Sequence, residues 1–93
     1  MREKGRIGTQ EIQKPQGEIA RKLVGVFSEV FGMAPERVYA DLGPEEVEQW
    51  DSIGHVALVA AIETTFSISL DSDEVMEITS FRTAVSTLEK KMR

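Results

Sequence analysis

The stretch Trp50-Asp51-Ser52-Ile53-Gly54-His55-Val56 joins an acidic, turn-rich segment to the longest run of apolar residues at helical spacing. Serine is a favoured N-cap residue, so Ser52 is expected at or just before the first turn of a helix. The first backbone N–H groups of a helix lack intrahelical acceptors, and with the helix dipole they favour an anion nearby. Ser52 is therefore either a simple helix cap or the carrier of an anionic group.

Apolar spacing predicts two long helices. One begins at Ser52 and ends near Phe66, and it is apolar on more than one side. The other runs from about Glu18 to Phe31, because its apolar residues form one stripe at the helical period. Gly32 follows where a C-cap glycine is expected. The stripe consists of Ile19, Leu23, Val26, Phe27, Val30 and Phe31.

Two further helices are predicted nearer the C-terminus. Asp71 or Ser72 is expected to cap a short helix, with acidic residues in its first turn. Ser80 is expected to cap the last helix. The apolar contacts are expected from Val75, Met76 and Ile78 in the short helix, and from Phe81, Ala84, Val85 and Leu88 in the last one. The predicted fold is all-α, a small four-helix bundle with three main helices and one short helix.

A long connection, residues 32–51, separates the two long helices. Pro35 is expected to open a short helical turn, and Asp41-Leu42-Gly43-Pro44 is predicted to form another turn. Trp50 is interpreted as a core anchor rather than a ligand-stacking residue, since its size favours burial. The apolar residues that tether this connection to the core are Val38, Tyr39, Leu42, Val47 and Trp50.

Length and composition exclude several classes of protein. The chain has 93 residues, which suffice for one small domain, and it contains no cysteine and one histidine. A disulfide framework, a cysteine nucleophile and a metal site are therefore not predicted. The longest unbroken apolar run, residues 56–62, is too short to cross a bilayer, and no secretory signal opens the chain. A cytoplasmic protein without a membrane segment is expected.

Charge is distributed unevenly along the chain. Residues 1–17 carry four basic and two acidic side chains without apolar periodicity, so they are predicted to form a flexible N-terminal tail before a domain at 18–93. Between Glu36 and Glu77 eleven acidic side chains accompany one basic side chain. This balance argues against nucleic acid as a partner. The acidic surface either favours partners with a basic patch or serves solubility alone.

Catalytic and cation-binding motifs find little support. Asp71-Ser72-Asp73 begins like a calcium loop, but Val75 stands at the third ligand position and no glycine occupies the sixth. No glycine-rich phosphate loop occurs. Ser52 with His55 three residues later suggests a hydrolase, but nucleophilic catalysis also needs an orienting acid and an oxyanion site in a pocket. A bundle of this size offers little room for one, and the protein is predicted not to be an enzyme.

Residues 18–91 resemble acyl carrier proteins and the related peptidyl and aminoacyl carrier domains. The tripeptide Asp51-Ser52-Ile53 is close to the Asp-Ser-Leu of that family, at the head of a long helix. The run Ile62-Glu63-Thr64-Thr65-Phe66-Ser67-Ile68-Ser69-Leu70 is similar to the family's apolar-acidic-Phe-x-Ile-x-Leu segment. An acidic short helix at 71–78, the pair Thr79-Ser80 and a closing amphipathic helix complete the resemblance.

The resemblance implies a cofactor and a function. Ser52, preceded by Asp51, would carry 4′-phosphopantetheine through a phosphodiester, and the thiol of that arm would hold an acyl group as a thioester. The implied partners are a phosphopantetheinyl transferase and acyl-activating, condensing or acyltransferase enzymes with basic docking patches. A monomer is expected. A peptidyl or aminoacyl carrier protein and an unmodified helical interaction module remain the alternatives.

Departures from the family pattern indicate a specialised pathway, within fatty-acid or polyketide chemistry, rather than standard fatty-acid synthesis. Many fatty-acid carrier proteins have an acid soon after the tripeptide and several more along the helix. Here Gly54, His55, Ala57 and Thr64 occupy that helix, and Glu63 is its one acid. His55 is interpreted as a helix residue near the edge of the core, with contact to the phosphate as the alternative.

The helix after Ser52 has two apolar faces, and a small bundle cannot easily bury both. Leu58, Val59, Ile62 and Phe66 are assigned to the core, because they include the largest side chains. The opposite face is then exposed beside Ser52, unless the long connection or the short helix covers it. We expect this face, together with Glu63, to bind partner enzymes. It consists of Ile53, Val56, Ala57 and Ala60.

Overall fold

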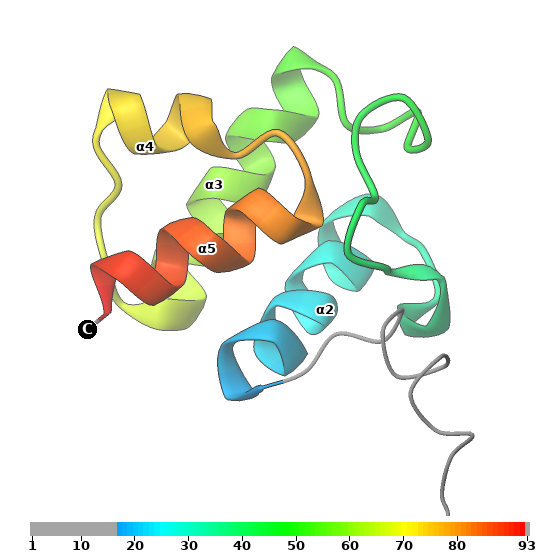
Figure 1. The fold of residues 1–93 in the computed structure, drawn as a ribbon. Coiled ribbons are helices and arrows are strands. Elements are labelled where there is room, and N and C mark those ends of the chain that lie inside the picture. The colour runs from blue at the N-terminus through cyan, green and yellow to red at the C-terminus, as the bar shows by residue number, and fades with distance from the viewer. Residues whose placement is uncertain (1–16, 93) are drawn as a thin grey trace, which may run out of the picture.

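The computed structural model describes residues 17–92 and contains four α-helices (Figure 1). Nearly all of the predicted N-terminal tail lies outside these residues. In chain order the elements are α2 (Glu18–Phe31), the 3₁₀ turn η1 (Pro35–Arg37), α3 (Ser52–Phe66), α4 (Ser72–Glu77) and α5 (Phe81–Lys91). The structure confirms the all-α bundle of three main helices and one short helix.

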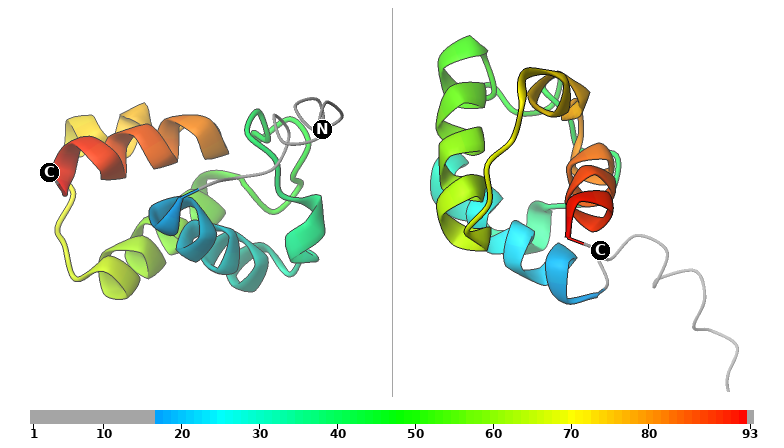
Figure 2. Two further views of the ribbon diagram at one scale, coloured as in Figure 1. Left: turned by 60° about the horizontal axis from the view of Figure 1, so that its bottom comes forward. Right: turned by 90° about the vertical axis from the view of Figure 1, so that its left-hand side faces the viewer.

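The helices surround one apolar core. In the right-hand view of Figure 2, α3 and α5 lie on opposite sides and α4 crosses the top. In the same view α2 lies at the bottom, and the long connection after η1 lies at the right of the bundle in Figure 1. Its Trp50 is 4% exposed, which confirms the anchor role. Trp50 lies edge-on to Phe27, with ring centroids 5.3 Å apart, and stacks on Phe31 at 5.5 Å. The largest fully buried side chains are Phe27, Phe81, Leu23, Leu58, Ile62, Ile78 and Leu88.

The helix ends follow the predicted capping signals. Gly32 ends α2 in the left-handed conformation at φ 63°, which glycine adopts without steric cost. Asp71 and Ser80 begin α4 and α5, each with a reciprocal capping box. In α4 the third helical residue, Glu74, accepts the N–H of Asp71, while the Asp71 carboxylate accepts the N–H of Glu74. These caps explain why helix bounds were predictable at these positions.

The predicted turn at residues 41–44 is wrong. The chain instead turns at 39–42 and again at 43–46, closed by bonds from the N–H of Leu42 to the Tyr39 carbonyl and from Glu46 to Gly43. Between these turns the backbone passes the start of α5, where the carbonyl of Leu42 accepts the N–H of Phe81. The free N–H groups at the start of α5 thus bind the backbone near Leu42. The two turns therefore form on either side of the predicted position at residues 41–44.

Two predicted apolar contacts do not form as expected. Met76 is 75% exposed, whereas Ile78, the residue after α4, is buried. The backbone is extended at Ile78, so the helical spacing that the prediction assumed does not place it on the same side as Met76. Tyr39 is also partly exposed at 38%. Val38, Leu42 and Val47 of the same connection are buried as predicted.

Candidate functional site

Asp51, and not Ser52, caps α3. The Asp51 carboxylate accepts the N–H of Gly54 at 2.8 Å, and its carbonyl accepts the N–H of His55 at 2.8 Å. The backbone is still extended at Asp51, as an N-cap requires, so Ser52 becomes the first helical residue. The expected place of Ser52 at the first turn is confirmed, the alternative in which it caps the helix is wrong, and its hydroxyl makes no hydrogen bond within residues 17–92.

Ser52 is exposed at the beginning of a 15-residue helix. Asp51 satisfies the N–H groups of Gly54 and His55, while those of Ser52 and Ile53 have no acceptor within residues 17–92. No acidic side chain stands in the first turn of α3. Unpaired N–H groups and the positive end of the helix dipole therefore lie beside the Ser52 hydroxyl, a setting that suits a phosphodiester anion.

Gly54 stands where the connection approaches the first turn of α3 most closely. A Cβ atom built on Gly54 would lie 1.9 Å from the backbone carbonyl oxygen of Gln49. Any other residue would therefore push the end of the connection away from the helix. The sequence gave no sign that position 54 requires glycine, because the requirement comes from the close approach of the backbone at Gln49.

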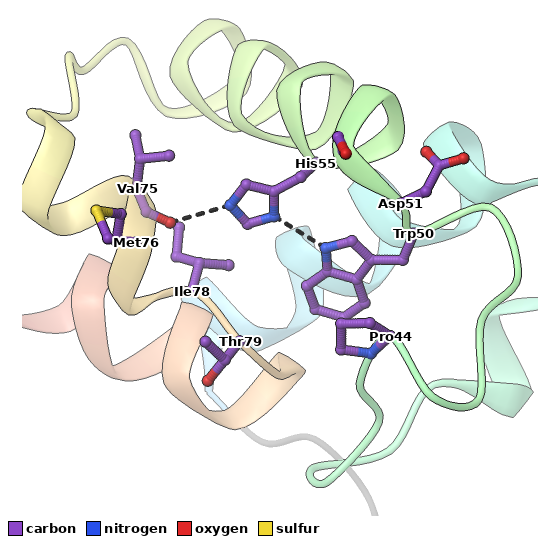
Figure 3. A pocket seen from close by; sticks show the side chains of 9 residues that line it. Pro44, Trp50, Asp51, His55, Val75, Met76, Ile78 and Thr79 are labelled. Atoms are coloured by element: carbon purple, nitrogen blue, oxygen red, sulfur yellow. Dashed lines mark hydrogen bonds between the residues drawn. The ribbon is translucent and has the colours of Figure 1, made fainter.

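His55 connects three elements (Figure 3). Its Nδ1 accepts the indole N–H of Trp50 at 2.9 Å, and its Nε2 lies 3.0 Å from the carbonyl oxygen of Val75 in α4. The imidazole and indole planes differ by 10°. His55 is half-buried at the edge of the core, as predicted. The alternative, contact with a phosphate, finds no support here, since both ring nitrogens are engaged.

A shallow cleft of about 550 Å³ opens beside Ser52. It lies between the start of α3, the end of the connection and α4 (Figure 3). Its walls are mainly apolar, and Asp51 supplies the one carboxylate among them. The lining residues are Pro44, Trp50, Asp51, Ser52, His55, Val75, Met76, Ile78 and Thr79.

The two apolar faces of α3 are oriented as predicted. Leu58, Ile62 and Phe66 are buried, and Val59 is half-buried. On the outer face Ile53 is 81% and Val56 is 68% exposed. Neither the connection nor α4 covers this face. We call it the outer strip of α3; its members Ile53, Val56, Ala57 and Ala60 are all exposed.

Glu63, expected on the partner-binding surface, has an internal contact. One of its carboxylate oxygens accepts the N–H of Leu70 at 2.8 Å and so holds the segment between α3 and α4. Its side chain is half-buried. The sequence showed Glu63 as the one acid of α3 but gave no sign of the Leu70 contact, which depends on the fold of residues 67–71.

Within residues 17–92, the pKa that departs clearly from its ordinary value is that of Glu74 in α4. The N–H of Asp71 and then the Lys91 ammonium, 2.9 Å away, hold the pKa of Glu74 below its ordinary value of 4.5. The Glu74–Lys91 pair joins α4 to the end of α5.

The fold and the site define a class: a small helical bundle with a serine hydroxyl exposed at the start of a long helix. The sequence model of a family described as "Phosphopantetheine attachment site" matches residues 21–88, most of the chain. The chain belongs to this family, whose members are carrier domains that bear a 4′-phosphopantetheine group and interact with phosphopantetheinyl transferases and biosynthetic enzymes. Comparison with curated protein sequences gives no significant match. Within residues 17–92 no helix is long and apolar enough to cross a membrane.

Proposed function

We propose that Ser52 is the attachment site of the 4′-phosphopantetheine group. The observation that carries this proposal is the exposed, uncommitted hydroxyl of Ser52 at the first position of α3. Asp51 supports the role, because its capping bond frees Ser52 and fixes the start of the helix. The N–H groups of Ser52 and Ile53 would face the phosphodiester. The arm supplies a thiol for thioester chemistry, and the chain supplies its placement.

We further propose that the chain is a monomeric acyl carrier protein of a specialised pathway, with residues 18–93 as its carrier domain. Gly54 supports the departure from the fatty-acid pattern. An acidic side chain at this position would collide with the Gln49 carbonyl, so the connection and the start of α3 are built for a residue without Cβ. A peptidyl or aminoacyl carrier protein is the second candidate, because the fold and the serine serve either cargo.

The outer strip of α3 is the proposed docking surface for partner enzymes. Its apolar residues begin directly after Ser52, and Glu63 of the same helix supplies negative charge. A partner with an apolar contact surrounded by basic side chains fits this surface. We keep Glu63 in this proposal through the carboxylate oxygen that does not bind Leu70.

Intact mass spectrometry tests the attachment site. The chain is incubated with coenzyme A and a broad-specificity phosphopantetheinyl transferase. The wild type should gain one phosphopantetheine group and Ser52→Ala should gain none. Ser72→Ala is the matched control, because Ser72 is also an exposed first helical residue after a capping aspartate, and it should be modified fully. An unmodified wild type would favour the interaction module, and a modified Ser52→Ala chain would overturn the assignment.

Transferase kinetics test the docking surface. Ala57→Lys places a charge on the outer strip without touching the core, so kcat/KM should fall several-fold while the melting temperature stays within a few degrees. Ser86→Lys, on an exposed position of α5, is the control and should leave both quantities unchanged. Equal rates for the two variants would remove the outer strip from the proposal.

A further inference from the structure

The hydrogen bonds of His55 determine which of its nitrogens carries the proton. An indole N–H is a donor only, so Nδ1 of His55 must be the acceptor in the 2.9 Å bond from Trp50. The neutral ring then carries its proton on Nε2, which donates to the Val75 carbonyl at 3.0 Å. The result is one directed chain of hydrogen bonds from the end of the connection, through α3, to α4.

The Trp50 end of this chain requires an acceptor. Trp50 is 4% exposed, and a buried N–H without a partner costs more than the hydrogen bond itself contributes. The Phe27 and Phe31 rings pack against the indole and fix its position. His55 is therefore held in one tautomer by a neighbour that cannot easily move.

The Val75 end acts on the most weakly anchored helix of the bundle. None of the six residues of α4 is buried, and the side chain that anchors this region is Ile78, just beyond the helix. The Glu74–Lys91 pair joins α4 to α5, on which it packs. An element with so little buried surface opens easily, so a hydrogen bond that attaches it to α3 affects its position strongly.

We propose that His55 is a positioning residue that, through the bonds Trp50–His55–Val75, holds α4 beside Ser52 and sets the width of the cleft there. Ser52, Val75 and Met76 line the same cleft, so the position of α4 determines the surroundings of the Ser52 hydroxyl and of any group attached to it. The consequence for attachment rests on the proposed function of Ser52, whereas the hydrogen bonds do not.

Nitrogen NMR of the wild-type protein at neutral pH tests the hydrogen bonds directly. The His55 ring should be in the Nε2–H tautomer, with a through-bond coupling between the indole nitrogen of Trp50 and Nδ1. A merely space-filling histidine would show a mixture of tautomers. An Nδ1–H tautomer, or exchange between both forms, would overturn the proposal.

Three variants test the consequence for α4. His55→Leu should speed amide exchange at Ile78, whose N–H bonds to the Val75 carbonyl, by about tenfold and slow modification of Ser52 by about three- to tenfold. His55→Gln keeps a terminal N–H donor for Val75, so both quantities should lie between those of the leucine variant and the wild type. Thr64→Ala, exposed on α3, is the control and should match the wild type.

The outcomes separate the positioning role from the proposed function. If the wild type is never modified, the proposed function fails, while the tautomer and the exchange rates still decide whether His55 holds α4. If the wild type is modified and His55→Leu reacts at the same rate with unchanged exchange, the positioning role is overturned. If His55→Leu does not fold, the glutamine variant and the tautomer of the wild type decide.

Discussion

Asp51-Ser52 and Asp71-Ser72 begin α3 and α4 in the same way. In both, the aspartate side chain accepts the N–H of the residue three positions later, and an exposed serine is the first helical residue. The helices then differ: α3 has 15 residues and α4 has six. The same Asp-Ser pair thus begins two helices whose N-termini differ in their capacity to bind an anion.

The third helical residue makes the difference. In α4 this residue is Glu74, whose carboxylate accepts the Asp71 N–H and lies in the first turn with Asp73. In α3 it is Gly54, which has no side chain and lies against the Gln49 carbonyl. The positive end of α4 therefore faces three of its own acids, Asp71, Asp73 and Glu74, whereas that of α3 faces Asp51 alone. In this chain the first turn of α3 holds no carboxylate, and that of α4 holds those of Asp73 and Glu74.

The largest effect is expected when α3 is given the first turn of α4. Gly54→Glu should lower the free energy of unfolding by about 1–3 kcal/mol, because the new Cβ displaces the Gln49 carbonyl. It should also slow modification of Ser52 by about two- to fivefold, because a carboxylate then competes with the phosphate for the helix end. Gly54→Ala separates the two causes, since it keeps the steric conflict alone. Chemical denaturation and intact mass measure both effects.

If Gly54→Ala proved as stable as the wild type, the close approach of the connection would be unimportant. The comparison would then rest on charge alone.

A smaller effect is expected from removing each cap in turn. Asp51→Ala and Asp71→Ala should each cost about 0.5–2 kcal/mol, since each frees one N–H group at a helix start. Asp51→Ala should also slow modification of Ser52, and it should do so more than Asp71→Ala, which acts only through the position of α4. Equal modification rates for the two variants would show that the cap of α3 has no part in presenting Ser52.

The contribution of Glu74, in the first turn of α4, to the stability of the protein should depend weakly on pH. The pKa of Glu74 is lower in the folded protein than its ordinary value, so its contribution is complete above about pH 4.5 and is lost as the pH falls through the lowered pKa. The difference in melting temperature between wild type and Glu74→Gln should therefore shrink on acidification from pH 6 to pH 3. A difference that persists at pH 3 would assign the effect to packing instead.

The smallest effect is expected from the two serines. Ser52→Ala and Ser72→Ala should each change the free energy of unfolding by less than about 0.5 kcal/mol, because neither side chain caps its helix. The expectation from sequence, in which Ser52 caps α3, would give about 1 kcal/mol for the first variant. Denaturation curves of both variants therefore distinguish the two descriptions of the site.

Helix bounds and the core face of α3 were predictable because each depends on local chemistry. The stripe in α2, the caps at Asp71 and Ser80, and the spacing of Leu58, Ile62 and Phe66 act over one or two turns. Ser52 was placed at the start of the correct helix, but the alternative in which it caps that helix was wrong, since Asp and Ser are equally good caps and the sequence does not choose between neighbours.

Features that depend on distant segments were not predictable. The bond from His55 to Val75 spans 20 residues and exists because the fold brings α4 within hydrogen-bonding distance of the first turns of α3. The need for glycine at position 54 comes from the path of the connection, and the contact of Glu63 with Leu70 comes from the path between α3 and α4. Met76 was misassigned because a six-residue helix shows too little periodicity to reveal its inner side.

The hydrogen bond of Trp50 also gives the protein an optical property. Trp50 is the one tryptophan of the chain, and it lies two residues before Ser52. Because its indole N–H bonds to His55 and its ring packs against Phe27 and Phe31, we expect its fluorescence to come from a single environment. Release of α4 or attachment of a group beside the cleft would change the imidazole next to the indole, and the emission would change with it. The loading state of this carrier can then be followed without an added dye.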